Sequence, residues 1–123
     1  MRTLSTDVSA AALGVDRKTL DNVLAREGRY LIGIGSRGRR RRIPVPALEA
    51  VAIALILNRD IGVSVAKGLE LAGRVLDSPD SPVKMGSLSA LMFDLPRLRR
   101  ALEFSIADAL EGVAERSRGR PRS

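Results

Sequence analysis

The sequence predicts a mostly α-helical fold, arranged as one domain or as one small domain with an appendage. At 123 residues the chain can bury a single core of modest size. Its aromatic side chains are only Tyr30, Phe93 and Phe104, so Leu, Ala, Ile and Val must build that core, as suits closely packed helices. Apolar residues also recur at helical spacing in several segments that begin at a capping residue or end at a glycine.

The N-terminal part predicts two short helices joined by a tight turn. Ser5 is the expected N-cap of the first helix, and Gly14 is its expected end because glycine readily adopts the left-handed conformation that terminates helices. Asp16 is expected to cap a second helix that ends at Gly28. The apolar face of this second helix carries Leu20, Val23 and Leu24. The small residue Ala10 allows the two helices to approach each other closely.

A β-hairpin is expected next. Residues 30–34 are a candidate strand, residues 35–38 a glycine-rich turn and residues 39–43 the returning strand. The hairpin carries Arg37, Arg39, Arg40, Arg41 and Arg42. These guanidinium groups repel one another, so the run costs stability unless an anion compensates their charge. A solvated basic loop or a nuclear-import signal would explain the charge, but neither explains the helix pair directly upstream.

The rest of the chain predicts three more helices. A third helix is expected from about Pro46 to Asn58, and a fourth that Ser64 caps and that ends near Leu76. Residues 77–82 have the composition of a linker, and residues 88–93 are a strand or a loop. The last helix is expected from about Leu95 to Glu115.

Charge is distributed unevenly along the chain, whose net charge is +7. Residues 1–42 hold ten Arg and Lys against four acids, residues 43–115 hold seven against ten, and residues 116–123 hold four Arg and no acid. Basic ends around a mildly acidic middle indicate a nucleic-acid-binding surface next to a packing module. Arginine, which suits bidentate phosphate and guanine contacts, dominates over lysine.

Several functions are excluded or disfavoured by composition. Without Cys or His, the chain offers no disulfide, no zinc site and no thiol or imidazole catalysis, and we expect neither a metal nor a cofactor. Because the acids are scattered singly, we expect no enzyme. The glycines at 33, 35 and 38 fit a dinucleotide-binding motif, but an arginine run and Pro44 follow where that motif needs a helix. The apolar run from Ala47 to Leu57 is too short to span a bilayer, and the polar N-terminus resembles no secretory signal.

The stretch AAALGVDRKTLDNVLAREGRYLIGIGSRGRRRRIPVPALEAV resembles the winged helix-turn-helix domains of MerR-type regulators and phage excisionases. The resemblance covers about residues 4–57, and the next helix, up to Leu76, also fits the MerR order of elements. It implies that the helix from Asp16 to Arg26 reads the major groove of double-stranded DNA, and that residues 35–42 form a wing on the backbone or minor groove. It further implies a cytoplasmic, nucleoid-associated protein of a bacterium or phage.

The expected organisation follows from this resemblance: residues 1–76 form the DNA-binding domain, residues 77–82 a linker, residues 83–115 a helical packing or dimerisation region, and residues 116–123 a basic disordered tail. Candidate groove contacts are Arg17, Lys18, Asn22 and Arg26, since Arg reads guanine and Asn reads adenine. The arginines of the wing are expected to supply phosphate affinity.

The C-terminal tail adds Arg118, Arg120 and Arg122 as candidate DNA contacts. The run Arg-Gly-Arg-Pro at 118–121 resembles an AT-hook core, which binds narrow minor grooves. Chance matches are common in arginine-rich tails, so we favour a disordered segment that binds phosphates generally.

A homodimer is expected from an apolar stripe along the last helix, formed by Leu95, Leu98, Leu102, Ile106, Ala109 and Val113.

Sequence-specific DNA binding in transcriptional regulation is the favoured function. The alternatives are an excisionase-like protein that bends DNA, and an antitoxin-type module that also binds a protein. A recombinase, a polymerase or a toxin would then be the protein partner.

Overall fold

The computed structural model describes residues 2–27 and 42–119, with side chains except at 26–27 and 114–119. Within these residues the protein is mostly helical and contains two small two-stranded antiparallel sheets. In chain order, the elements are β1 (Thr3–Ser5), α1 (Thr6–Leu13), α2 (Arg17–Glu27), β2 (Arg42–Pro44), α3 (Val45–Ile61), α4 (Val65–Asp77), β3 (Val83–Lys84), β4 (Ala90–Leu91) and α5 (Leu95–Gly119). The prediction of a mostly α fold is confirmed.

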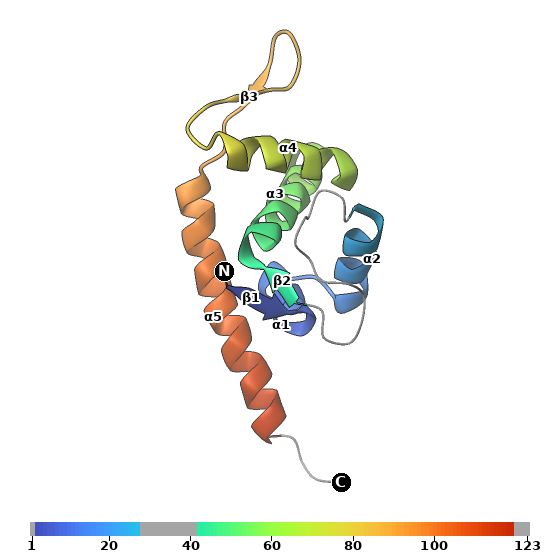
Figure 1. Ribbon diagram of the computed structural model, residues 1–123, viewed down its shortest axis with the longest axis vertical. Coiled ribbons are helices and arrows are strands. Elements are labelled where there is room, and N and C mark those ends of the chain that lie inside the picture. The colour runs from blue at the N-terminus through green and yellow to red at the C-terminus, as the bar shows by residue number, and fades with distance from the viewer. Residues whose placement is uncertain (1, 28–41, 120–123) are drawn as a thin grey trace.

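Helix α3 is the centre of the molecule. It is buried on nearly all sides from Ala47 to Ala54, as suits its apolar composition. Helix α4 crosses one end of α3, α5 runs along one side of the molecule, and α2 lies on the other side (Figure 1). Helix α3 begins at Val45 and continues to Ile61, three residues beyond the predicted end, because Gly62 rather than Asn58 takes the left-handed terminating conformation, with φ 73°.

Close contact between α3 and α4 depends on Gly68. A Cβ placed at this glycine would lie 3.0 Å from the Cα of Ala54 and 3.1 Å from its Cβ. Both distances are shorter than ordinary van der Waals contact, so a larger residue at position 68 would push the two helices apart. Ser64 caps α4 as predicted, since its Oγ accepts a hydrogen bond from the backbone N–H of Lys67 at 3.2 Å.

The N-terminal segment forms a strand that the sequence analysis did not predict. Leu4 pairs with Ile43 in the antiparallel register of β1 and β2, and both side chains are buried. The returning strand was expected at 39–43, and the structure has a strand, β2, at Arg42–Pro44. Among the described residues, β2 pairs with the N-terminal strand β1. The expected partner strand at 30–34 lies outside the described residues.

Helix α5 packs against the N-terminal half of the chain. Leu102 and Ile106 share one core cluster with Leu4 and Val8, and with Leu48 from α3. The apolar stripe that suggested a dimer is thus covered by the chain's own core: Ala109 belongs to the same cluster, and Leu95 belongs to the main core cluster. The prediction that this stripe forms a dimer surface is wrong for its buried members, because other elements of the same chain already cover that face.

A partly buried ion pair joins α5 to α3. Arg99 donates from Nε to Oε2 of Glu49 at 3.1 Å and from Nη2 to Oε1 at 3.3 Å. Glu49 is only 9% exposed, so this bidentate contact satisfies a carboxylate that has little access to water. The pair accounts for the acid within the apolar run of α3.

The last helix is longer than predicted. Its backbone continues to Gly119, so residues 116–119, which we expected in a disordered tail, are helical. The sequence places no proline inside this stretch, and Pro121 lies just beyond it. Residues 120–123 lie outside the described residues.

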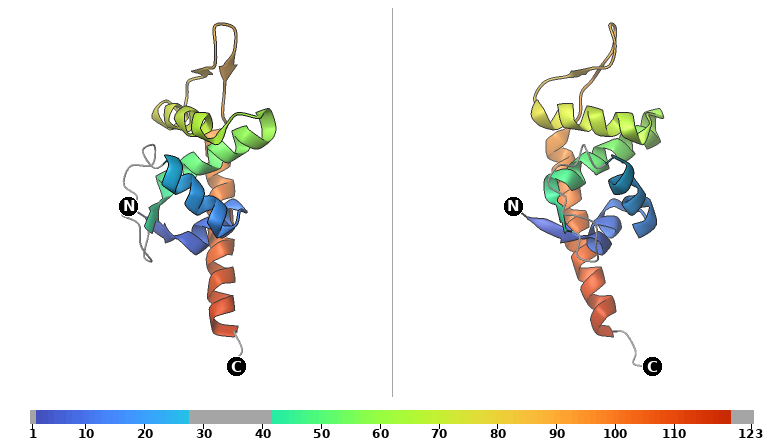
Figure 2. Two further views of the ribbon diagram at one scale, coloured as in Figure 1. Left: turned by 90° about the vertical axis from the view of Figure 1, so that its right-hand side faces the viewer. Right: turned by 45° about the vertical axis from the view of Figure 1, so that its right-hand side comes forward.

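The hairpin of β3 and β4 projects beyond α4, away from the helices (Figure 2). It contains residues 88–91 of the segment 88–93, which was predicted as a strand or a loop, and β4 is a strand at Ala90–Leu91. Val83 at its base is buried, whereas Leu88 near its tip is 97% exposed. No helix in the described part of the chain has both the length and the apolar composition needed to cross a bilayer.

Candidate nucleic-acid interface

The turn between α1 and α2 is built from local hydrogen bonds. Gly14 adopts φ 73°, and its N–H donates to the carbonyl of Ala11 at 3.2 Å. The N–H of Val15 donates to the carbonyl of Ala10 at 3.1 Å. These bonds satisfy carbonyls at the end of α1 and direct the chain into α2. Ser5 caps α1 as predicted, accepting from the N–H of Val8 at 3.2 Å.

Asp16 caps α2, as the sequence predicted. Its Oδ1 accepts a hydrogen bond from the backbone N–H of Thr19 at 2.7 Å. Hydrogen bonds from the side chain and the backbone of Thr19 hold the pKa of the Asp16 carboxyl below its ordinary value, because they stabilise the charged form. The carboxylate is therefore a fixed negative charge at the beginning of α2.

One face of α2 is buried and the opposite face is open to solvent. Leu20 and Leu24 belong to the main core. The predicted groove contacts Arg17, Lys18 and Asn22 are all exposed. Lys18 and Asn22 lie on the face opposite Leu20, whereas Arg17, three residues before Leu20, is exposed at the beginning of the helix. Arg26 lies within α2, but its side chain is outside the described part of the chain. The structure thus places Lys18 and Asn22 on one accessible face and leaves Arg17 accessible at the beginning of the helix.

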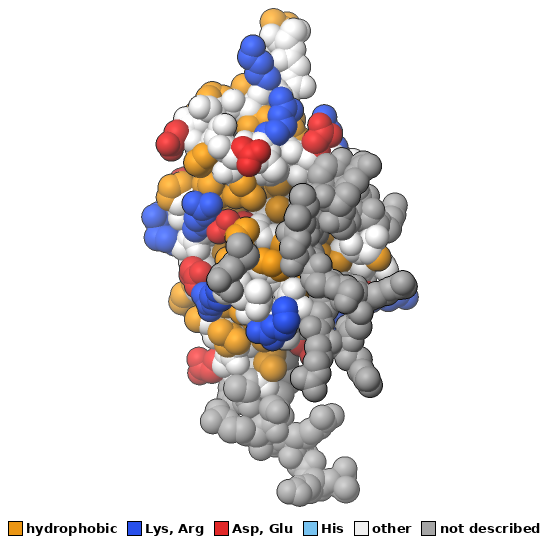
Figure 3. Space-filling model, viewed as in Figure 1, with side chains coloured by type: hydrophobic (Ala, Val, Ile, Leu, Met, Phe, Trp, Pro, Cys, Tyr) orange, Lys and Arg blue, Asp and Glu red, His pale blue; other side chains and the backbone are white. Residues whose placement is uncertain are grey.

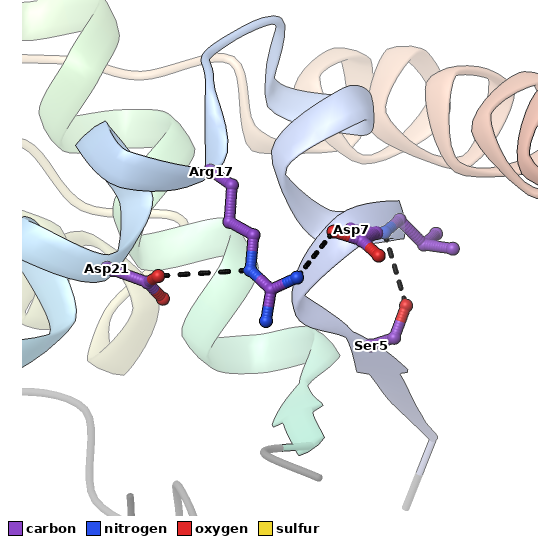
Figure 4. Close-up of polar contacts among 5 residues, drawn as sticks. Ser5, Asp7, Arg17 and Asp21 are labelled. Carbon is purple, nitrogen blue, oxygen red and sulfur yellow. Dashed lines mark hydrogen bonds and ion pairs between the residues drawn. The ribbon is translucent and has the colours of Figure 1, made fainter. Parts of the chain in front are cut away.

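Arg17 is held between two carboxylates (Figure 4). Its Nη1 donates to Oδ1 of Asp7 at 3.1 Å, and its Nε lies 3.9 Å from Oδ2 of Asp21. All three side chains remain about half exposed, so water and salt screen these ion pairs. The arrangement leaves Nη2 directed away from both acids.

Sequence reasoning did not identify Asp7 and Asp21 as partners of Arg17. The i, i+4 spacing of Arg17 and Asp21 was a usable signal, since residues four apart are neighbours on a helix. The contact with Asp7 had no such signal, because it crosses from α1 to α2 and depends on the angle between the helices.

Of the wing arginines, the structure describes Arg42. Its Nη2 donates to the backbone carbonyl of Thr3 at 2.9 Å, and its Nε donates to Thr3 Oγ1 at 3.3 Å. Arg42 therefore ties β2 to β1, and a phosphate contact would have to compete with these hydrogen bonds. The other wing residues, Arg37, Arg39, Arg40 and Arg41, lie outside the described residues.

The C-terminal candidates are only partly described. Arg118 falls within the backbone of α5, and its side chain is not among those described. Arg120 and Arg122 lie outside the described residues. Among the residues that the structure does describe, no group of three acidic side chains is arranged to hold a metal ion.

No protein-family model, no curated protein and no solved structure matches this chain. The candidate interface therefore rests on the geometry of α1 and α2 and on the charge of the chain.

Proposed function

We propose that this protein binds double-stranded DNA sequence-specifically and acts in transcriptional regulation. In this proposal α1 and α2 form a helix-turn-helix, α2 is the recognition helix, and the arginine-rich segment after α2 serves as a wing. The protein acts by binding and carries out no chemical step.

The observation that carries the proposal is the two-sided character of α2. Leu20 and Leu24 anchor the helix in the core, while Lys18 and Asn22 are exposed on the opposite face and Arg17 is exposed at the beginning of the helix. A helix that enters the major groove needs this division, because one face must be fixed while the other presents donors and acceptors to base edges. The turn at Gly14, the cap at Asp16 and the arginine run downstream support the same interpretation.

Each exposed side chain has a distinct role in this proposal. Asn22 can bond adenine bidentately through its amide, and Arg17 can bond guanine once its guanidinium turns from the carboxylates. Lys18 and the arginines at 37–41 neutralise phosphates, which fixes the position of α2 on the duplex but reads no sequence.

The test is selection of preferred sites from a random duplex library, followed by competition against every single-base variant of the selected site. Asn22→Ala should cost about 1–3 kcal/mol on the selected site and relax the preference at one base pair. Arg41→Ala, the matched control, should weaken selected and random DNA about equally. If no site is enriched, or if Asn22→Ala weakens all variants alike, α2 does not read bases in this way.

A further inference from the structure

A groove lies where α1, α3 and α5 meet. Its volume is about 410 Å³, and pockets that hold small ligands have volumes of about 300–1,000 Å³. Apolar side chains from all three helices form most of its lining: Leu13 from α1, Leu55 and Ile56 from α3, and Leu98 and Ala101 from α5. We call this hollow the three-helix groove. Because helices from distant parts of the sequence build its walls, the packing of the core fixes its shape.

The apolar walls of the three-helix groove keep contact with water. Leu13, Leu55 and Leu98 pack against the main core on one side, yet each remains half-buried. Ile56, one residue after Leu55, is half-buried as well. Water between such walls finds few polar partners, so its release by an apolar ligand is favourable. The groove therefore suits a ligand with an apolar chain or ring.

The tip of the β3–β4 hairpin is apolar too, but it has the opposite shape. Figure 3 shows hydrophobic side chains at the end of this projection, and Leu88 near the tip is 97% exposed. A convex tip surrounds no ligand, whereas the three-helix groove offers walls from three helices. Apolar exposure by itself thus makes no binding site, and the hairpin tip provides a control for adsorption to exposed apolar surface.

Arg59 gives the three-helix groove its charge. Among the described residues that line the groove, it is the only one with an ionisable side chain, and Ser105 adds a hydroxyl. Arg59 belongs to the last turn of α3 and its side chain is 75% exposed, so its guanidinium lies at the open side of the groove. Its Nε donates to Oδ1 of Asp60 at 3.0 Å, but a guanidinium has further N–H donors for a ligand. The charge of the groove therefore complements an anion.

We infer that the three-helix groove binds a small amphiphilic carboxylate, a free molecule with an apolar chain and one negative charge. The chain lies between the half-buried leucines, where its burial supplies most of the affinity. The carboxylate stays at the opening and accepts hydrogen bonds from Arg59. A cation of the same shape meets a like charge there, and a neutral molecule lacks the ion pair. The inference does not rest on DNA binding, because α2 contributes nothing to the described lining.

Titration calorimetry with three ligands of equal chain length provides the test: octanoate, 1-octanol and octylammonium, all below the concentrations at which they form micelles. Octanoate should saturate one site with a Kd below about 1 mM. It should bind about two- to fivefold more tightly than octanol, the scale of an exposed ion pair, and octylammonium should bind most weakly. From hexanoate to octanoate, each added methylene should tighten binding about fourfold.

Variants at the opening separate the charge from the apolar walls. Arg59→Gln should remove the preference for octanoate over octanol and leave the affinity for octanol unchanged. Asp60→Asn removes the acid that competes for Arg59, so it should tighten octanoate binding about twofold without changing octanol binding. If wild type binds all three ligands equally well, the groove does not select an anion and the inference is overturned.

A variant that fills the groove tests its location. Ala101 is exposed and lines the groove, so Ala101→Leu should fold normally and lower the affinity for octanoate at least about tenfold. Ala107→Leu is the matched control, since this alanine is also exposed on α5 but does not line the groove. Leu88→Ser controls for adsorption to the hairpin tip. Both controls should bind octanoate as wild type does.

Three results contradict the inference. Octanoate binding that never saturates, or that survives Ala101→Leu, places the ligand elsewhere. An equal loss in Leu88→Ser shows adsorption to exposed apolar surface. If octanoate does not bind and Ala101→Leu changes the mass found by sedimentation, a second copy of the chain occupies the groove instead of a small molecule. Urea unfolding of Ala101→Leu and Ala107→Leu shows whether a loss of binding reflects a filled groove or a damaged fold.

Discussion

The guanidinium of Arg17 donates to the carboxylate of Asp7 at 3.1 Å, across the turn that joins α1 to α2. Asp21 lies on the other side of the same guanidinium. The surface proposed to meet DNA thus contains two acids, and they offset part of its positive charge. In the proposed complex DNA competes with these carboxylates for Arg17.

Removing one acid should therefore strengthen binding to DNA. Asp7→Asn is expected to raise affinity for random duplex about two- to fivefold at low salt, the scale of an exposed ion pair. The free energy of unfolding should change by less than about 1 kcal/mol, for the same reason. Fluorescence anisotropy against salt concentration measures the affinity. Asp60→Asn, which removes an exposed acid paired with Arg59 at the end of α3, is the control. An equal gain in that variant would show a general charge effect rather than release of Arg17.

The cap at Asp16 should make stability depend on pH in acid. Its carboxyl has a lowered pKa in the folded protein, so its contribution to stability is fully present above the ordinary carboxyl pKa. This contribution is lost as the pH falls through the lower folded value. Asp16→Ala should therefore be less stable than wild type at neutral pH, with a difference that shrinks in strong acid. Urea unfolding at a series of pH values measures this.

A cap without a titrating group provides the comparison for Asp16. Ser64→Ala removes the cap of α4 and should cost about 1 kcal/mol, independently of pH. If the Asp16→Ala difference is equally constant with pH, the hydrogen bonds from Thr19 do not depend on the ionised carboxylate.

The contact between α3 and α4 should not tolerate a side chain at position 68. Gly68→Ala places a methyl group about 3 Å from Ala54 and should cost about 1–2 kcal/mol, the overpacking penalty less the gain in helix propensity. Gly73→Ala, on the same helix, meets nothing within 4 Å and should instead stabilise by about 0.5–1 kcal/mol. Thermal or urea unfolding measures both. Similar effects from the two substitutions would mean that α4 moves freely relative to α3.

Helix boundaries were largely predictable, because they depend on residues close together in sequence. Ser5, Asp16 and Ser64 each accept a hydrogen bond from a backbone N–H three residues ahead. Gly14 ends α1 through bonds to carbonyls three and four residues earlier. In these places the chemistry of a short segment decides the conformation whatever packs around it.

The exposed face of α2 was predictable for a similar reason. The helical repeat alone separates Leu20 and Leu24 from Lys18 and Asn22, and the structure has the same division. Arg17 is exposed for another reason, because it is the first residue of the helix. Periodicity does not depend on which partner covers the apolar side. It identifies the face left open, but not the acids that come to lie beside it.

What only the tertiary structure decided are the contacts between segments distant in sequence. The pairing of Leu4 with Ile43, the ion pair of Glu49 with Arg99, and the packing of α5 on the N-terminal elements all join residues 39 or more positions apart. An apolar stripe has the same sequence pattern whether it packs against another chain or against the core of its own chain, because hydrophobic burial is not directional. The stripe of α5 was covered from within the chain by Leu4 and Val8, and the face on which Phe104 remains exposed became evident only when that packing was known.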